Sequence, residues 1–184
     1  MYLRRKIDDY LTQWKNNENR YPLIIKGARQ IGKTESVKHF ADRNYESVVS
    51  INFALEKQFQ MILSDWYDVE NIIKNISLID PSKKFIANRT LIIFDELQEL
   101  PDIATSLKAF KLDGRFDVIC SGSLLGINYK KIHSNSVGYK TDYEMFSMDF
   151  EEFLWAKDHV YTNKFNCDTL DYALEMVKDK PVYV

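Results

Sequence analysis

The sequence predicts an α/β fold in which a largely parallel sheet is covered by helices on both faces. Short apolar segments alternate with longer segments of helical periodicity along the 184 residues, a pattern typical of consecutive β-α-β units. The clearest apolar segment, TLIIFDE, has no polar–apolar alternation, which favours a parallel strand buried on both faces. With 45% hydrophobic and 14% aromatic residues, the chain can bury the core that such a fold needs.

The first predicted element is a helix over residues 3–16, where apolar side chains recur at helical spacing. Pro22 ends this segment, and LIIK at residues 23–26 follows as a short buried strand. Residues 34–43 are expected to form a second helix. Residues 47–54, SVVSINFA, then have the composition of a second strand.

The middle of the chain contains the next helical region and the third strand. Residues 55–79 are expected to be mostly helical, with an inner face formed by Phe59, Ile62, Leu63 and Trp66. The sequence DPSKK interrupts this pattern, because Asp80–Pro81 favours a turn. The segment TLIIFDE, residues 90–96, is the third strand.

The last predicted elements follow the same alternation. Residues 101–110 are expected to be helical, and FDVICSGS, residues 116–123, to form the fourth strand. YEMFSM, residues 143–148, is the expected fifth strand. A further helix begins with MDFEEFLWA at residues 148–156.

The length of the chain suits one domain, or one domain with part of a second. Residues 1–155 are therefore expected to form one core, and residues 156–184 the helical start of a truncated C-terminal region. Arg4 and Arg5, which precede this core, are expected to be surface charges.

Composition and charge exclude several classes of protein. The net charge of −2 gives no general attraction to nucleic acid or to an anionic membrane. No segment approaches the roughly 20 apolar residues of a membrane helix, and the N-terminus lacks the apolar run of a secretory signal. Cys120 and Cys167 lie far apart, as free thiols of a reducing compartment do, so a cytoplasmic location is expected.

The octapeptide GARQIGKT, between the first strand and the following helix, fits the phosphate-binding pattern G-x-x-x-x-G-K-[ST]. Its two fixed glycines let successive backbone N–H groups point at phosphate oxygens. The helix that follows presents its positive N-terminal end to the same anion. The candidate binding residues are Gly27, Ala28, Arg29, Gln30, Ile31, Gly32, Lys33, Thr34 and Glu35.

Two side chains of this loop have predicted roles. Lys33 would reach the β and γ phosphates of a nucleotide, and the Thr34 hydroxyl would ligate Mg²⁺. The alternative is a chance match at a glycine-bearing turn. The buried strand before the loop and the helix after it favour the phosphate-binding interpretation.

The third strand ends in two carboxylates, Asp95 and Glu96, about sixty residues after the loop. A phosphate-binding loop needs a carboxylate at the end of a nearby parallel strand to hold Mg²⁺, and Asp95 is the candidate. Glu96 could orient and deprotonate an attacking water. The alternative is a strand that simply ends in a charged turn.

The same segment helps to separate classes of nucleotide-binding protein. GTPases carry N-K-x-D, whereas Asn163-Lys164-Phe165-Asn166 lacks the Asp. DELQ is similar to the D-E-x-Q box of helicases, so a helicase-like motor stays an alternative. However, the sequence has no tract of paired basic and aromatic residues that would mark a single-strand channel.

The fourth strand ends in Ser121, Gly122 and Ser123. Ligands of parallel sheets bind at the carboxyl ends of the strands, so either hydroxyl could contact a γ phosphate or the attacking water. Ser-Gly-Ser is also a common turn sequence. Ser121 and Ser123 are therefore weaker catalytic candidates than Lys33 and Glu96.

Taken in order, KGARQIGKT, LIIFDELQEL and VICSGSLLG resemble a family of prokaryotic ATPases of the AAA+ superfamily. YLRRKIDDYLTQW and MDFEEFLWA are similar to that family as well. The resemblance implies a three-layer P-loop NTPase fold with five parallel strands in the order 5-1-4-3-2. It also implies ATP and Mg²⁺ as ligands and hydrolysis of the γ phosphate. Gly27 to Thr34 would be Walker A, Asp95 and Glu96 Walker B, and Ser121 or Ser123 the sensor.

The chain departs from this family at two places. Members usually carry Gly-Arg before the fifth strand, whereas SVGYK puts Tyr139 and Lys140 after Gly138. Lysine could supply charge there, but not a bidentate fork. Members also continue into a C-terminal domain similar to restriction endonucleases, and a contact with nucleic acid is expected only through that part. A protein partner or self-association is a further expectation. An ATP-dependent switch or adaptor that hydrolyses slowly is the alternative to an efficient ATPase.

Overall fold

The computed structural model of the chain describes residues 2–64, 66–123 and 138–161. Within these ranges, residues 7–147 belong to one compact unit, and residues 2–6 and 148–161 belong to a second. The expected boundary between residues 155 and 156 stays a prediction. Residues 162–184, which include Cys167, lie outside the described residues.

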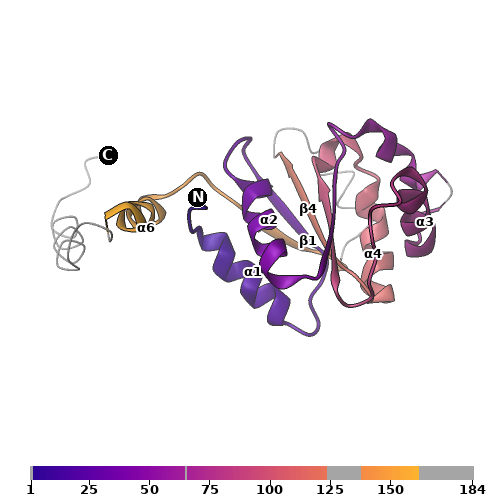
Figure 1. Cartoon of the computed structure of the whole chain (residues 1–184), viewed down its shortest axis with the longest axis horizontal. Coiled ribbons are helices and arrows are strands. Elements are labelled where there is room, and N and C mark those ends of the chain that lie inside the picture. The colour runs from indigo at the N-terminus through magenta and orange to yellow at the C-terminus, as the bar shows by residue number, and fades with distance from the viewer. Residues whose placement is uncertain (1, 65, 124–137, 162–184) are drawn as a thin grey trace. The chain divides into compact units, whose positions relative to one another are not determined.

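The larger unit is built on a five-stranded sheet (Figure 1). Its strands are β1 (Leu23–Gly27), β2 (Ser47–Asn52), β3 (Thr90–Asp95), β4 (Asp117–Ser123) and β5 (Thr141–Glu144). Neighbouring strands pair in parallel, in the order β2-β3-β4-β1-β5. Read from the other edge, this order is 5-1-4-3-2, so the expected fold class and strand order are confirmed.

Helices cover both faces of this sheet and make three layers (Figure 1). One face carries α1 (Lys6–Asn16) and α2 (Lys33–Asn44), and the other carries α3 (Val69–Ile79) and α4 (Ile103–Asp113). Alternate strand residues supply the two cores. In β3, Leu91 and Ile93 belong to the core with α1 and α2, whereas Ile92 and Phe94 belong to the core with α3 and α4. Burial of both faces explains why this segment shows no polar–apolar alternation.

The segment expected to be helical between β2 and β3 is divided into η1 (Lys57–Leu63) and α3. The Asp68 carboxylate accepts a hydrogen bond from the Asn71 N–H at 3.0 Å and caps the start of α3. Phe59 and Ile62 are buried as predicted, but Trp66 is 72% exposed, so its predicted place on the inner face is wrong. The reason is that a new helix starts after Trp66, which leaves this residue in the connection.

The fifth strand lies earlier in the chain than expected, at Thr141–Glu144. Its pairing with β1 fixes this position, because the Thr141 N–H donates to the Pro22 carbonyl at 2.9 Å and the Met145 N–H to the Lys26 carbonyl at 2.7 Å. Pairing therefore ends where β1 turns into the glycine-bearing loop. The apolar residues of YEMFSM from Met145 onward are not part of the strand.

The second unit contains α6 (Phe150–Tyr161), close to the helix predicted from residue 148. Asp149 and Glu152 form a capping box, in which each carboxylate accepts from the backbone N–H of the other at 2.9 and 3.0 Å. Arg5 Nε lies 3.1 Å from Glu152 Oε1, and both side chains are less than 10% exposed. The expectation that Arg5 is a surface charge is therefore wrong. Burial raises the pKa of Glu152, but hydrogen bonds from the Lys6 N–H and from Arg5 outweigh it and lower the pKa.

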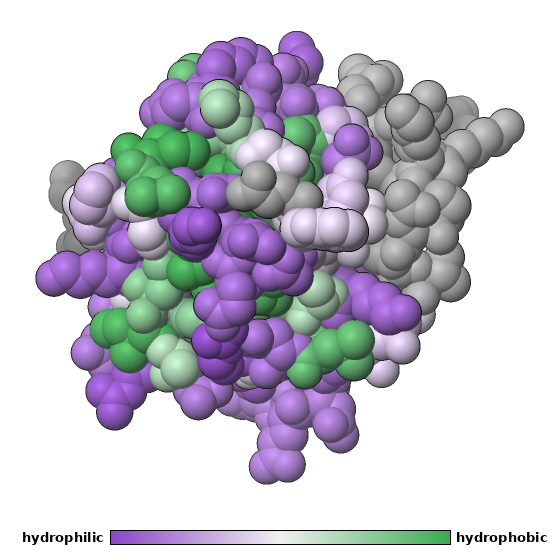
Figure 2. Space-filling model, turned by 90° about the vertical axis from the view of Figure 1, so that its right-hand side faces the viewer, coloured by the Kyte–Doolittle hydropathy of each residue, from purple (hydrophilic) through white to green (hydrophobic). Residues whose placement is uncertain are grey.

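The outer surface on the side of α3 and α4 is mainly hydrophilic, with separate hydrophobic patches (Figure 2). Large hydrophobic side chains that are exposed in the larger unit include Leu55, Met61, Leu78 and Leu112. Scattered apolar side chains of this kind are ordinary on a globular domain. In the ranges that the structure describes, no helix has the length and apolar character needed to cross a bilayer.

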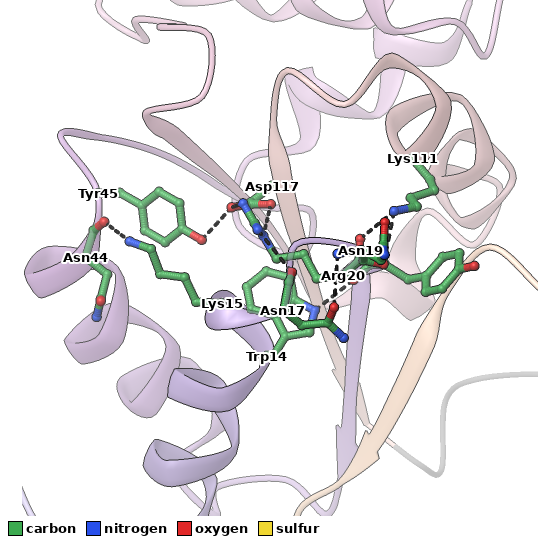
Figure 3. Close-up of polar contacts among 10 residues, drawn as sticks. Trp14, Lys15, Asn17, Asn19, Arg20, Asn44, Tyr45, Lys111 and Asp117 are labelled. Atoms are coloured by element: carbon green, nitrogen blue, oxygen red, sulfur yellow. Dashed lines mark hydrogen bonds and ion pairs between the residues drawn. The ribbon is translucent and has the colours of Figure 1, made fainter.

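A polar cluster connects three segments at the end of the sheet where β4 begins (Figure 3). The Asp117 carboxylate accepts from Arg20 Nε at 2.7 Å and from Arg20 Nη2 at 2.9 Å. The Tyr45 hydroxyl donates to the same carboxylate at 2.7 Å. Burial, together with the charge of Asp117, raises the pKa of Tyr45. The cluster joins the segments after α1 and α2 to β4, at the opposite end of the strands from the loop.

Replacing Asp117 by Ala is expected to lower the free energy of unfolding by about 1–3 kcal/mol, because Arg20 and Tyr45 lose their shared acceptor. Urea unfolding followed by circular dichroism measures this change. The matched control is Asp102→Ala, since Asp102 is exposed and its side chain makes no capping hydrogen bond. Equal unfolding midpoints for the two variants would contradict the structural role of the cluster.

Candidate functional site

The loop between β1 and α2 adopts a conformation that only glycine permits at its two fixed positions. A Cβ atom on Gly27 would lie 2.3 Å from the Met145 carbonyl oxygen and 2.6 Å from Ile31 Cδ1. Gly32 has φ 94° and lies at the start of α2. These two constraints explain locally why the sequence GARQIGKT forms this turn.

Lys33 folds back over the loop. Its ammonium group donates hydrogen bonds to the Gly27 carbonyl at 3.1 Å and to the Ala28 carbonyl at 2.5 Å. Burial lowers the pKa of Lys33, although the charges of Glu96 and Asp95 act in the opposite direction. An anion bound beside this ammonium would therefore stabilise a partly buried charge.

Asp95, the last residue of β3, is 4% exposed and is held by hydrogen bonds from several elements. Its carboxylate accepts from the Thr34 hydroxyl of α2 at 3.0 Å and from Asn52 Nδ2 of β2 at 3.1 Å. The Ser121 hydroxyl of β4 donates to it as well. A buried carboxylate with this many donors has a fixed orientation.

Glu96 follows in a left-handed conformation, with φ 59° and ψ 52°. Such angles are uncommon for a residue with a side chain, and they turn the chain sharply at the end of β3. The short helix η2 (Leu97–Glu99) begins directly afterwards. From this helix, Gln98 Nε2 donates a hydrogen bond to Glu96 Oε2.

A cavity of about 650 Å³ opens at this end of the sheet. The residues that line it come from the loop, α2, η2 and the ends of strands: Arg29, Gln30, Gly32, Lys33, Thr34, Glu35, Ala54, Glu96, Gln98, Glu99 and Ser123. Two of these side chains are cationic and three are carboxylates. The two cationic side chains would attract an anionic ligand. A bound metal ion would offset the negative charge of the three carboxylates.

Most of the predicted site residues are brought together around this cavity, but not all of them. Gly27, Ala28 and Ile31 belong to the loop without lining the cavity, and Ile31 packs against the core of α1 and α2. Asp95 does not line the cavity, but its carboxylate accepts a hydrogen bond from Thr34, which does. Ser123 lines the cavity, whereas Ser121 lies one pleat deeper and bonds to Asp95. Of the two sensor candidates, Ser123 is therefore the one that can contact a ligand.

Several residues of the site were not expected from the sequence. Asn52 ends β2 beside Asp95, and its place at the carboxyl end of the strand SVVSIN is a signal that could have found it. Gln98 stands in the quoted motif DELQ, but its contact partners are not readable from the motif. Ala54 and Glu99 line the cavity without any such signal.

Lys140 does not line the cavity. Its side chain is 6% exposed, and its ammonium group lies 2.6 and 2.7 Å from the two carboxylate oxygens of Asp142. Tyr139 lies instead beneath the Lys108 ammonium, 4.9 Å from the ring centre. Among the described residues that line the cavity, Arg29 is the only arginine.

The oxygen atoms of Thr34 and Asp95 are suited to bind a hard divalent cation that a bound ligand would also coordinate. Within the described ranges, no group of three or more His, Cys, Asp and Glu side chains could hold a metal ion by itself. The Thr34 hydroxyl oxygen lies 3.0 Å from Asp95 Oδ2, and both groups can bind a metal ion through oxygen. Magnesium is bound in this way, by one or two protein oxygens together with phosphates and water.

Comparison with protein families identifies the chain. A model of the AAA domain family matches residues 19–154, which is well over half of the sequence. The chain belongs to the AAA domain family. The expected membership in the AAA+ P-loop ATPases is thereby confirmed, and it supports a nucleotide-binding, ATPase-like function. The matched range contains the loop, both carboxylates at the end of β3 and the end of β4.

Two solved structures similar to this AAA domain are PCH-2 from C. elegans and AMPPCP-bound DnaA from Aquifex aeolicus. The PCH-2 match has 13% identity and a TM-score of 0.45 and covers 77% of this chain. The DnaA match has 14% identity and a TM-score of 0.48 and covers 95% of this chain. The matches span 42% of the PCH-2 chain and 60% of the DnaA chain. Comparison with curated proteins found no match.

Proposed function

We propose that this AAA domain binds Mg·ATP in the 650 Å³ cavity and hydrolyses the γ phosphate to drive a conformational change. The observation that carries the proposal is the convergence of three groups on one cavity. These are Lys33 in the loop, the hydrogen-bonded pair of Thr34 and Asp95, and Glu96 at the end of β3. These groups come from two segments that are 61 residues apart in the chain, so their convergence is a property of the fold.

Binding would begin with the loop. Its backbone N–H groups surround the phosphates, and the Lys33 ammonium leaves the Gly27 and Ala28 carbonyls to contact the β and γ phosphates. Thr34 and Asp95 would hold Mg²⁺. When bound, this ion would neutralise charge that develops on the phosphate oxygens. Arg29 supplies the second cationic side chain of the cavity.

Hydrolysis would use Glu96 as the base. A water molecule attacks the γ phosphorus, the bond from that phosphorus to the β–γ bridging oxygen breaks, and ADP leaves with the bond's electron pair. Glu96 accepts a proton from the attacking water and returns it to the products. Ser123, whose hydroxyl has no hydrogen-bond partner among the described residues, would contact the γ phosphate or the water.

A slower ATP-dependent switch is the second candidate function. Lys140 is bonded to Asp142, so the segment before β5 brings no described cation to the cavity. Such a protein would bind ATP, hydrolyse it slowly and engage a protein partner or another copy of itself. A nucleic-acid contact through a C-terminal part, a prokaryotic origin and a cytoplasmic location stay predictions.

Phosphate release from ATP by the purified protein tests the proposal, with Mg²⁺ present or removed by EDTA. We expect turnover with Mg²⁺ and a loss of at least about 100-fold without it, because the carboxylates of the cavity then repel the triphosphate. Binding of ATP without turnover supports the switch instead. Absence of ATP binding at millimolar concentration, with Mg²⁺ present, would refute both functions.

A further inference from the structure

Gln98 connects Glu96, the candidate base, to the end of β4. A role of Gln98 in hydrolysis rests on the proposed function of the cavity. Gln98 Nε2 donates to Glu96 Oε2, and Gln98 Oε1 accepts from the Ser123 backbone N–H at 3.2 Å. Glu96, Gln98 and Ser123 all line the cavity. One amide group therefore bridges two walls of the site that are 25 residues apart in the chain.

The orientation of this amide follows from the chemistry of its two partners. A carboxylate oxygen accepts hydrogen bonds, and a backbone N–H can only donate. The amide nitrogen must therefore face Glu96 and the amide oxygen must face Ser123. Glutamate at this position would have no donor for Glu96 and lysine no acceptor for the Ser123 N–H, so the bridge depends on the amide.

The second observation concerns the Ser123 side chain. Ser123 lines the cavity but is only 2% exposed, and its buried hydroxyl has no hydrogen-bond partner among the described residues. A buried hydroxyl without a partner is costly, and a bound ligand would supply the missing contact. The residue that would contact the ligand is therefore the one whose N–H holds Gln98.

Glu96 Oε1 remains available when Gln98 donates a hydrogen bond to Glu96 Oε2. Gln98 binds Oε2, and no hydrogen bond to Oε1 is made within the described residues. The left-handed backbone places Glu96 at a sharp turn, and the hydrogen bond from Gln98 in η2 restrains its side chain there. A base misplaced by about 1 Å can lose on the order of 100-fold in rate.

We propose that Gln98 is a positioning residue for ATP hydrolysis. Its amide fixes the Glu96 carboxylate against the end of β4, with one oxygen free to accept the proton of the attacking water. Ligand contact at Ser123 is thereby coupled to the position of the base, through the N–H of the same residue.

Kinetics of Gln98→Ala and Gln98→Glu, measured beside wild type, test this role. Gln98→Glu keeps an acceptor for the Ser123 N–H but removes the donor to Glu96. We expect both variants to lower kcat by about 10- to 100-fold. For Gln98→Ala, the affinity for a non-hydrolysable ATP analogue with Mg²⁺ should stay within about threefold of wild type. Gln60→Ala is the matched control, because Gln60 is also half-buried, bonds to a backbone carbonyl and does not line the cavity.

A double variant separates positioning from a general disturbance of the site. If Gln98 acts through Glu96, adding Gln98→Ala to Glu96→Gln should change the residual turnover by less than about twofold. Independent losses in the double variant would overturn the proposal. So would a kcat at or above wild type in either single Gln98 variant, or an affinity loss in Gln98→Ala that matches its loss of kcat.

The same measurements distinguish a failure of the role of Gln98 from a failure of the proposed hydrolysis. Wild type without turnover, or Glu96→Gln with wild-type turnover, refutes the proposed hydrolysis and the role of Gln98 with it. Turnover that is lost in Glu96→Gln but unchanged in Gln98→Ala refutes the role of Gln98 alone.

Discussion

A Glu96→Gln variant is expected to bind Mg·ATP about as tightly as wild type and to lose roughly 100- to 10,000-fold in turnover. Glutamine has nearly the same shape as glutamate, but it cannot accept the proton of the attacking water. The contacts proposed for phosphate come from the loop and those proposed for Mg²⁺ from Thr34 and Asp95, and the substitution leaves all of them in place. The change should therefore separate binding from chemistry.

Phosphate release and equilibrium binding of a fluorescent ATP analogue, measured on the same preparations, test this expectation. Glu46→Gln is the matched control, because Glu46 is an exposed carboxylate that pairs with Arg89 away from the cavity. Wild-type turnover in Glu96→Gln would remove the carboxylate from the mechanism. Loss of turnover in both variants would show that the assay reports something other than this site.

A Lys33→Ala variant is expected to lose about 100-fold or more in affinity for Mg·ATP. An ammonium bonded to phosphate oxygens makes charge-assisted hydrogen bonds, and a 100-fold change corresponds to about 2.7 kcal/mol. Without Lys33, the cavity keeps Arg29 as its one cationic lining residue among the described residues, against three carboxylates.

Isothermal titration with Mg·ATP measures this loss, and Lys38→Ala serves as its control. Lys38 is an exposed residue of α2 that does not line the cavity, so its removal tests the general effect of lost charge. Thermal unfolding of both variants shows whether the fold is retained. Unchanged affinity in a folded Lys33→Ala protein would refute phosphate binding by the loop.

The local part of the site is predictable from the sequence because it depends on short-range backbone constraints. Gly27 cannot carry a Cβ, Gly32 has a positive φ, and both requirements are visible in the spacing of GARQIGKT. The buried segment of β3 is similarly predictable, because its apolar residues alternate between two cores. These elements also determine the parallel sheet that brings Asp95 beside Thr34.

The remaining parts depend on contacts between distant segments. The position of β5 is set by hydrogen bonds to Pro22 and Lys26, which the composition of YEMFSM does not reveal. Ser121 and Ser123 are alike in sequence, but their depth along β4 directs one to Asp95 and the other to the cavity. The bridge made by Gln98 needs the three-dimensional placement of η2 beside β4.

The most direct test of the central claim is a crystal structure of the protein with Mg²⁺ and a non-hydrolysable ATP analogue. We expect the triphosphate to lie against the N–H groups of the loop, with the Lys33 ammonium moved from the Gly27 and Ala28 carbonyls to the β and γ phosphates. Mg²⁺ should contact the Thr34 hydroxyl. An analogue bound away from the loop, or a Lys33 that keeps its carbonyl contacts in the complex, would refute phosphate binding by this loop.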